Sequence, residues 1–514
     1  MITIAFTPMI IPIFSGIASV VVGAKSVKVR NFIITTSFTV AFLLNTYFLV
    51  LSIIGSFNYV ELGEFTVNAA SLSISELILL LGLAGALYSY GYMEERSETW
   101  AYYLFYQLFI AMMIGMVSSF NILVIYIFME ASSVTSAVLV MFSRRRSSIL
   151  AAYRYIALSI FGGIILVGGV FLQYNLTRNL NINTLTNLEN PYLNILATLY
   201  LLGLGVKAGL LPFGPLWLPP AHSEAPIPIH TLLSAALVQA AAFNIARVLG
   251  AIGITNIYIS NMLLTVGLAS MLVGSLYALL EALIGSKYTR FHVGLRHIRG
   301  IKRVWAFSTI SEVGYIAAFL GLAGILVGQG SKADEALILG FGGALLHMYN
   351  HGFAKSQLLF DSGVMIKMSH AEDLNFMGGL AKRLPFMKLS FTVGAFSLGL
   401  LPGTLGVVTM KELIFNDGVP IMVKATVIMT AGLSLAACCL VWYSAFFSKP
   451  NHKLNNDTAI PKIMYLPGLI MGALILVLGI YFTLEWFGVI SSGSKIMNAL
   501  RILAETMVKA NRGA

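Results

Sequence analysis

Charged side chains stand inside several stretches of this sequence that are otherwise almost entirely apolar. Glu130 lies midway along one such stretch, in I-F-M-E-A-S-S-V-T-S, and Lys207 lies within another that begins near Asn194. An ionised group in lipid is costly, so such residues are retained where they face other protein or a water-filled cavity. A carboxyl and an amine held at membrane depth can each bind and release a proton, and we predict that Glu130 and Lys207 belong to an ion path.

A further group of ionisable residues follows the spacing of one helix face. His347, His351 and Lys355 are four residues apart in H-M-Y-N-H-G-F-A-K, which places neighbours about 6 Å apart along a helix axis. No carboxylate or cysteine joins them at the spacing of a metal site, so a proton relay is preferred to a metal site. Glu312, in S-T-I-S-E-V-G-Y, is an additional candidate for the path because it also lies inside an apolar stretch.

Two prolines interrupt apolar stretches close to charged residues. Pro212, five residues after Lys207, removes a backbone donor and clashes with the carbonyl four residues earlier, and Pro402 does the same nine residues before Lys411. We therefore predict helix breaks at both prolines, where freed backbone groups must face protein or water. Lys411 is followed by Glu412 near the end of its stretch, so an interfacial position is an equal alternative to a role in the path.

Polar residues also follow the first break, where the sequence continues as W-L-P-P-A-H-S-E-A. His222 and Glu224 lie near the cytoplasmic side in the topology predicted below. They form either a site of proton uptake or a polar turn, and the polar turn is the preferred interpretation.

The composition defines the class of protein that must position these residues. The chain has 514 residues, of which 58% are hydrophobic and 10% are charged, and these proportions are typical of a polytopic membrane protein. Apolar runs of about 18 residues or more predict fourteen transmembrane helices. They lie near residues 2–22, 32–55, 71–92, 101–119, 121–142, 151–174, 193–220, 227–249, 257–281, 303–328, 334–366, 386–417, 420–447 and 462–489.

The distribution of Lys and Arg over the connecting loops predicts the orientation. If the fourteen helices alternate in direction, most of these residues fall on one side, which the positive-inside rule makes cytoplasmic. We therefore predict a multi-pass protein of the cell (inner or cytoplasmic) membrane with both termini on the outer side. The net charge of +11 is explained by these loops, and no basic stripe with interleaved aromatics indicates nucleic-acid binding.

The cysteines and the two ends of the chain give weaker signals. Cys438 and Cys439 are adjacent in an apolar run and form neither a disulfide nor a CxxC motif, so no redox cofactor or metal is expected in this chain. Residues 2–22 are interpreted as a retained first helix because no basic segment precedes them. The tail, residues 491–514, has apolar residues at helical spacing and is either a surface amphipathic helix or a frayed end.

The two predicted breaks also suggest internal symmetry. They fall in the seventh and the twelfth helix, five helices apart, so two five-helix units would run through the membrane in opposite directions. The predicted fold is an all-α polytopic membrane protein of about fourteen helices with two inverted five-helix repeats. It divides into three N-terminal helices (1–100), the first repeat (101–250), the second repeat (251–450), and the last helix with the amphipathic tail (451–514).

Three segments carry a family resemblance, and they read K-A-G-L-L-P-F-G-P-L-W-L-P-P-A-H-S-E-A-P-I-P, I-K-R-V-W-A-F-S-T-I-S-E-V-G-Y and H-G-F-A-K-S-Q-L-L-F-D-S-G. They resemble the antiporter-like subunits of respiratory complex I, of energy-converting membrane hydrogenases and of multi-subunit sodium/proton antiporters. The resemblance implies that Glu130 and Lys207 are the switching pair of the family. It also implies that His351 and Lys355 continue the path and that Lys411 lies at its outer exit.

The sequence departs from the family pattern at three positions. Gly214 stands where relatives usually have histidine, Gln239 stands where many have a lysine, and Gly300 replaces an acidic residue. Because glutamine does not carry a proton, the connection from Lys207 to the histidines would require water. These changes leave open a subunit whose path is altered or idle.

Three functions are compatible with the sequence. The first is an ion-translocating, most simply proton-pumping, subunit of a membrane oxidoreductase, with iron–sulfur clusters and other redox centres in a peripheral arm formed by partner subunits. The second is a subunit of a sodium/proton antiporter without a redox arm. The third is a structural membrane subunit that does not conduct ions. In each case the partners are other membrane subunits and the lipid bilayer.

Overall fold

Apart from one short hairpin, the described chain is helical. The computed structural model describes residues 2–23, 25–57, 59–94, 98–285, 300–449, 459–489 and 494–508. The α-helices are α1 (Ile2–Ala5), α2 (Thr7–Gly23), α3 (Val27–Ile53), α4 (Ala69–Tyr92), α5 (Thr99–Val117), α6 (Ile122–Val140), α7 (Arg146–Thr177), α8 (Asn190–Ala208), α9 (Gly214–Glu224), α10 (Ile227–Leu232), α11 (Val238–Ile252), α12 (Ile257–Gly285), α13 (Ile301–Gly328), α14 (Ala333–Leu337), α15 (Gly343–Ser369), α16 (Pro385–Leu398), α17 (Val407–Ile414), α18 (Ile421–Phe446), α19 (Tyr465–Trp486) and α20 (Ser494–Val508).

Short segments of other helix types join these elements. The 3₁₀ turns are η1 (Met141–Ser143), η2 (Ile182–Asn187) and η5 (Lys462–Met464). Two π-helical turns, η3 (Leu233–Leu237) and η4 (Ile338–Gly342), lead directly into α11 and α15. Turns of this type locally widen a helix and are frequent at functional sites.

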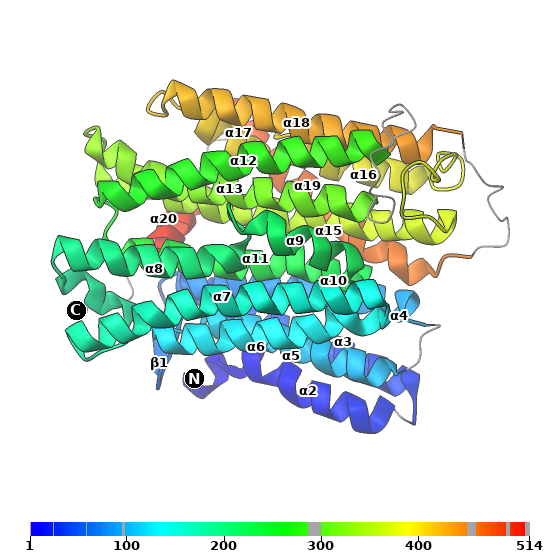
Figure 1. The fold of residues 1–514 in the computed structure, drawn as a ribbon, viewed down its shortest axis with the longest axis horizontal. Helices are drawn as coiled ribbons and strands as arrows, with labels where there is room; N and C mark the ends of the chain where they lie inside the picture. Colours follow the sequence, from blue (N-terminus) through cyan, green and yellow to red (C-terminus); the bar gives the residue numbers. More distant parts are fainter. Residues whose placement is uncertain are drawn as a thin grey trace.

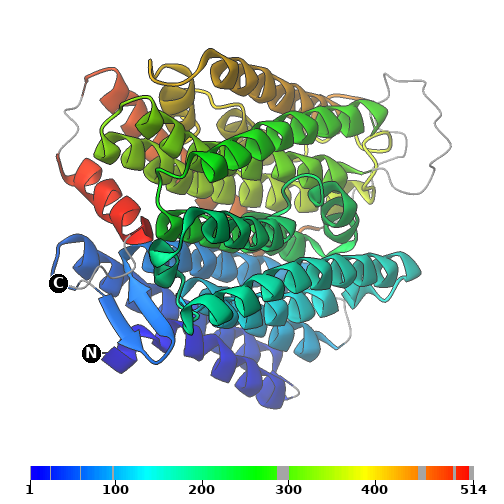
Figure 2. The ribbon, with the colours of Figure 1, turned by 60° about the vertical axis from the view of Figure 1, so that its left-hand side comes forward.

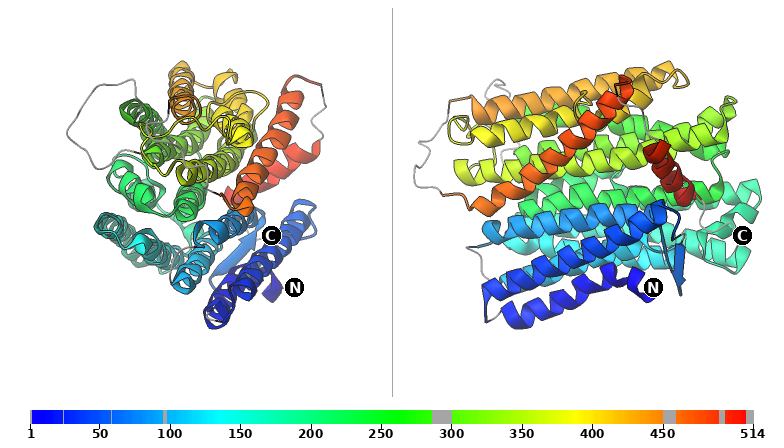
Figure 3. Two further views of the ribbon diagram at one scale, coloured as in Figure 1. Left: turned by 90° about the vertical axis from the view of Figure 1, so that its right-hand side faces the viewer. Right: turned by 180° about the vertical axis from the view of Figure 1, so that it is seen from behind.

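The long helices lie side by side and roughly parallel, as expected for a bundle that crosses a membrane (Figure 1, Figure 3). Within the described residues, 11 helices are long and apolar enough to span a bilayer. Large apolar side chains such as Phe386 and Ile421, which are 76% and 80% exposed, cover the outside. Polar side chains are buried between the helices, which is the distribution expected when lipid is the solvent. The chain is therefore an all-helical, multi-pass membrane protein.

A β-hairpin and the last helix lie at the same end of the bundle (Figure 2). Strands β1 (Tyr59–Leu62) and β2 (Phe65–Asn68) pair antiparallel, with Tyr59 opposite Asn68. Asn68 then caps α4, because its side chain accepts from the backbone N–H of Ser71 and the Ser71 hydroxyl accepts from the N–H of Asn68. The hairpin was not predicted from the sequence.

Helix α20 occupies the described part of the tail and packs against α4, α11 and η4. The side-chain amide of Asn68 donates to the Thr506 carbonyl at 3.0 Å, and Arg501 forms an ion pair with Asp334 at 2.8 Å. Residues 490–493 and 509–514 of the predicted tail lie outside the described residues. The described part of the predicted tail is therefore helical from Ser494 to Val508.

Very close packing fixes the pair α12–α13. A Cβ atom added to Gly274 of α12 would lie 2.4 Å from the Ser311 nitrogen, and one added to Gly314 of α13 would lie 2.6 Å from the Met271 nitrogen. Small residues let two membrane helices approach to backbone contact. The contact holds rigidly the part of α13 that carries the candidate residue Glu312.

Two long apolar runs of the sequence are each divided between shorter helices. Helix α8 ends at Ala208 because Gly209 adopts a left-handed conformation (φ +82°), and the N–H groups of Gly209 and Leu210 both bond to the Gly205 carbonyl at 3.0 Å. Pro212 lies in the segment that leads to α9. Helix α16 ends at Leu398 and α17 begins at Val407, with Pro402 in the connecting segment.

Candidate functional site

Lys207 lies in the last turn of α8, fully buried among hydroxyl groups of α6 and α7. Its ammonium donates to Ser133 Oγ at 2.6 Å and to Tyr155 OH at 2.7 Å, with Ser159 Oγ at 3.5 Å. Ser133 and Ser159 also bond to each other at 2.6 Å. All three partners are neutral, so the lysine has three acceptors and no neutralising charge among them. Such an environment stabilises an ammonium while leaving it able to give up its proton.

Glu130 lies one turn before Ser133 on α6, the helix that begins where Asn121 accepts hydrogen bonds from its first N–H groups. The carboxyl is packed against α7, where a Cβ on Gly163 would lie 2.7 Å from Oε1. Oε1 is buried and has no hydrogen-bond partner. Within the described residues Glu130 and Lys207 do not form an ion pair within 4 Å, although Ser133, one turn after Glu130 on α6, bonds to Lys207.

The segment after Lys207 explains one departure from the family pattern. The N–H of Gly214 bonds to the Leu210 carbonyl at 2.8 Å, and a Cβ on Gly214 would lie 1.9 Å from the Gly209 oxygen. Glycine is therefore required in this arrangement, and a histidine does not fit. The indole of Trp217 donates to the Val206 carbonyl at 2.8 Å, which satisfies an acceptor released at the end of α8.

His222, predicted to belong either to a site of proton uptake or to a polar turn, is fully buried. It packs edge-on against His230 of α10, with 4.7 Å between the ring centroids. All four ring nitrogens of the two histidines lack hydrogen-bond partners. His230 was not predicted from the sequence, because nothing in the short stretch P-I-P-I-H distinguishes it. Only the structure shows that it is buried. Helix α9 packs against α7 and α13, and α10 packs against α15, so this pair lies between the Lys207 cluster and α15.

Lys355 and His351 of α15 contact two different helices. The Lys355 ammonium donates to the Trp305 carbonyl at 2.9 Å and to the Ser308 hydroxyl, both on α13. The His351 ring forms a hydrogen bond through Nδ1 to the Gln239 side-chain amide of α11. The glutamine that replaces a lysine in this sequence thus bonds directly to the predicted relay.

His347, one turn before His351 on α15, is the third residue of the predicted group of His347, His351 and Lys355. Its Nε2 lies 3.1 Å from Glu312 Oε2, and its Nδ1 lies 2.9 Å from the Thr409 hydroxyl of α17. Both side chains of the His347–Glu312 pair are completely buried. The structure therefore brings Glu312 into the group with His347, and Thr409 connects the group to the helix that carries Lys411.

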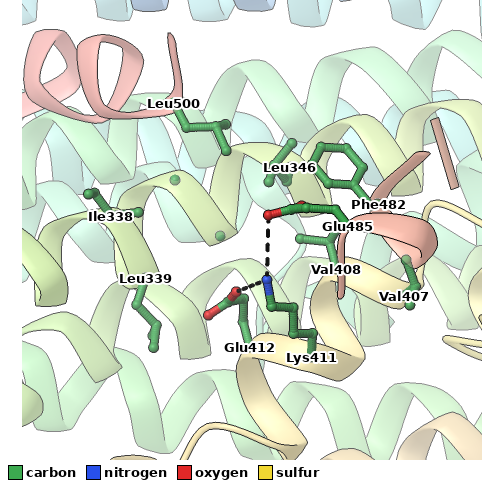
Figure 4. Close-up of a pocket in the computed structure, with 12 residues that line it drawn as sticks. Ile338, Leu339, Leu346, Val407, Val408, Lys411, Glu412, Phe482, Glu485 and Leu500 are labelled. Carbon is green, nitrogen blue, oxygen red and sulfur yellow. Dashed lines mark ion pairs between the residues drawn. The ribbon is translucent and has the colours of Figure 1, made fainter. Parts of the chain in front are cut away.

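Lys411 lies at the wall of a pocket of about 50 Å³ between η4, α15, α17, α19 and α20. Its ammonium is 3.9 Å from Glu412 and 3.9 Å from Glu485 of α19 (Figure 4). The rest of the lining is mainly apolar and includes Leu346 and Leu500. Glu485 was not predicted, because it lies far from Lys411 in the sequence. The Lys411 side chain is 35% exposed, so this end of the group opens to the outside of the bundle.

The ionisable groups do not form a metal site in the part of the chain that the structure describes, where no three His, Cys, Asp or Glu residues gather. Cys438 is buried and Cys439 is exposed, and both are free thiols. The predicted residues instead lie in separate clusters, which are found at α6–α8, at α9 and α10, at α15 with α11 and α13, and at α17 with α19. Groups of this kind at membrane depth are typical of a route for protons or small cations.

Comparison with known proteins gives several matches. The chain is 30% identical over 351 residues to Staphylococcus aureus proteins named "Putative antiporter subunit mnhA2", a match that covers 66% of this chain. The chain spans only 41% of the length of these relatives.

Two solved structures share the fold. One is the membrane-bound sulfane sulfur reductase, an archaeal respiratory membrane complex, with a TM-score of 0.79, 20% identity and coverage of 98% of this chain and 99% of the matched chain. The other is the Mrp complex from Dietzia sp. DQ12-45-1b, with a TM-score of 0.77, 19% identity and coverage of 98% of both chains.

The family model described as NADH:quinone oxidoreductase/Mrp antiporter, TM, matches residues 119–286 and 292–438. These segments include α6 to α17 and therefore all the predicted site residues, whereas Glu485 and Leu500 of the pocket beside Lys411 lie outside them. Since the match covers more than half of the 514 residues, the chain belongs to the NADH:quinone oxidoreductase/Mrp antiporter transmembrane family.

Proposed function

We propose that this chain is the ion-translocating, antiporter-like subunit of a membrane-bound respiratory oxidoreductase complex, and that the ion is the proton. The observation that carries the proposal is the set of buried ionisable groups that includes Lys207, His351 and His347, together with the half-buried Lys411. Retaining five or more such groups at membrane depth is costly unless ions pass between them.

The proposed mechanism begins at Glu130 and Lys207. The two residues are not paired within 4 Å, and Lys207 bonds instead to Ser133, so a change in the position of either residue alters the distance between the two charges. Drawing them together stabilises charge on both, and separating them favours release of a proton from Lys207. That proton would continue past His222 and His230 to the α15 group and leave at Lys411, with Gln239 holding His351 in place by its hydrogen bond.

The finer architecture belongs to the same proposal. We propose fourteen crossings, arranged as residues 1–100, two inverted five-helix units at 101–250 and 251–450, and a last helix with its tail at 451–514. The connecting segments at Pro212 and Pro402 would then be equivalent breaks in the seventh and twelfth crossings. The shared end of the hairpin and α20 supports placing both termini on one side, which we propose is the outer side.

A transport assay tests the role of the switching pair. Inverted membrane vesicles containing the complex are energised, and acidification is followed with a pH-sensitive dye in the Lys207→Ala and Glu130→Gln variants. We expect acidification to be lost in both while electron transfer continues. Lys332→Ala is the matched control, because Lys332 is 83% exposed and lies in a loop. Full acidification by both switching-pair variants would refute the proposal.

A specific observation also favours a second function, an antiporter subunit without a redox arm. The sequence relatives at 30% identity are named as putative antiporter subunits. Of the two matched structures, one is a respiratory membrane complex and the other is an Mrp complex. Purification of the intact complex through this chain decides between the two functions. Iron, flavin or another redox cofactor in the partner subunits supports the oxidoreductase, whereas their absence from an active assembly supports the antiporter.

A further inference from the structure

A buried carboxyl group lies on α15 outside the series of residues described above. Asp361 is 1% exposed, and neither of its carboxyl oxygens has a hydrogen-bond partner. Within the described residues no Lys, Arg or His nitrogen lies within 4 Å of it. It belongs to the segment H-G-F-A-K-S-Q-L-L-F-D-S-G, but neither the sequence nor the path through Lys355 and His351 uses it.

The surroundings of Asp361 are specifically shaped to receive polar groups. Gln357, one turn earlier, donates to the Ser390 carbonyl at 2.7 Å and to its hydroxyl at 3.0 Å, while its own oxygen remains without a partner. Two glycines of α19, also one turn apart, face this pair. A Cβ on Gly468 would lie 2.5 Å from Asp361 Oδ1, and one on Gly472 would lie 2.5 Å from Gln357 Nε2.

The electrostatics of the site favour an uncharged carboxyl. An ionised carboxylate that is removed from water needs several donors or a cation. The described surroundings of Asp361 hold no cation within 4 Å, and the nearby polar groups, Gln357 and Ser390, are neutral and bonded to each other. The close approach of Gly468 to Oδ1 leaves little space for a coordinated metal ion on that side. Binding of a proton removes the charge without requiring space.

Trp305 contacts both Lys355 and Ser362, the residue that follows Asp361 on α15. Its backbone carbonyl accepts from Lys355 at 2.9 Å, and its indole donates to the Ser362 hydroxyl at 2.8 Å. Asp361 follows Lys355 by six residues, which corresponds to about 9 Å along the helix axis. It is displaced toward Ser369, where α15 ends, and therefore away from Lys411.

We propose that Asp361, with Gln357 and Ser390, is a proton-binding site that supplies Lys355 from the end of α15 at Ser369. In the transfer the carboxylic acid becomes a carboxylate and the neutral amine of Lys355 becomes an ammonium, so the proton balances without another reactant. A new proton then arrives from water at the Ser369 end. The supply to Lys355 rests on the function proposed above, whereas the protonated state of Asp361 does not.

Infrared spectroscopy of the purified full chain, with the subunits that remain bound, tests the site directly. The C=O stretching band of buried carboxylic acids is compared between the parent and Asp361→Asn, in H2O and in D2O. We expect the variant to lose one band that shifts on deuteration in the parent. Identical spectra would show that Asp361 is not protonated and would overturn the proposal. A band that disappears on addition of sodium ions would instead assign a cation site and would also overturn it.

Vesicle acidification then tests the supply to Lys355. Asp361→Asn and Gly468→Ala, which places a methyl group against the carboxyl, are both expected to lower the initial rate. Gly432→Ala is the matched control, because a Cβ there meets nothing within 4 Å. Parental rates in both variants would overturn the supply role. Parental rates in Lys207→Ala in the same vesicles would instead show that the proposed function has failed.

Discussion

Replacing Gly214 with alanine tests the structure of the segment that follows Lys207. The added Cβ would lie 1.9 Å from the Gly209 oxygen and 2.7 Å from its carbonyl carbon, and both are backbone atoms that cannot rotate away. A close C···O contact is about 3.3 Å, so the segment must move by roughly 1.4 Å. The movement also disrupts the 2.8 Å bond from the Gly214 N–H to the Leu210 carbonyl.

The expected cost follows from these two effects. Overpacking of a fitted site costs about 1–3 kcal/mol, and loss of a hydrogen bond costs about 0.5–1.5 kcal/mol. We therefore expect Gly214→Ala to destabilise the chain by about 2–4 kcal/mol. Because the displaced segment holds the end of α8, we also expect vesicle acidification to fall.

Heating of the detergent-solubilised chain, followed by gel filtration, measures the loss of folded protein for Gly214→Ala and for a control. The control is Gly205→Ala in α8, where the nearest atom to the new Cβ is 3.8 Å away. In a helix this exchange stabilises by about 0.5–1 kcal/mol, so the two variants should shift in opposite directions. If Gly214→Ala melts with the parent or above it, the packing argument for this glycine is wrong.

Three further substitutions each test one of the other contacts. Trp217→Phe removes one of the two donors to the buried Val206 carbonyl, the other being the Gly209 N–H at 3.3 Å, and should lower stability in the same heating assay by about 0.5–1.5 kcal/mol, and an unchanged melting curve would contradict this. Glu312→Gln removes the anionic partner of His347 and should reduce vesicle acidification without loss of assembly, whereas the parental rate would exclude Glu312 from the path. Arg501→Ala should leave the melting curve unchanged, because its ion pairs are exposed and screened by solvent, and a clear loss of stability would show that α20 depends on them.

The membrane class and several of the site residues could be predicted because their signals are local. Glu130, Lys207 and Lys355 are charged residues in apolar runs, and that contrast is visible without knowing what they contact. The spacing of four between His347 and His351 likewise requires only the geometry of one helix.

Other parts of the site depend on contacts between segments that are distant in the sequence. Glu485 approaches Lys411 only because α19 packs beside α17, and no local pattern indicates that pairing. Ser133 also bonds to the Met129 carbonyl within its own helix, as serines in membrane helices commonly do, so its contact with Lys207 had no separate signal. Asp361 was not predicted, because the α19 glycines that face Asp361 and Gln357 are far from them in the sequence.

Helix α20 packs against three elements that are far apart in the sequence. These elements are α4, α11 and η4. Leu500 of α20 also lines the pocket beside Lys411. A movement of η4 away from α4 would therefore require α20 to lose its packing against one of them. Because Leu500 lines the pocket, such a movement would also change the wall beside Lys411.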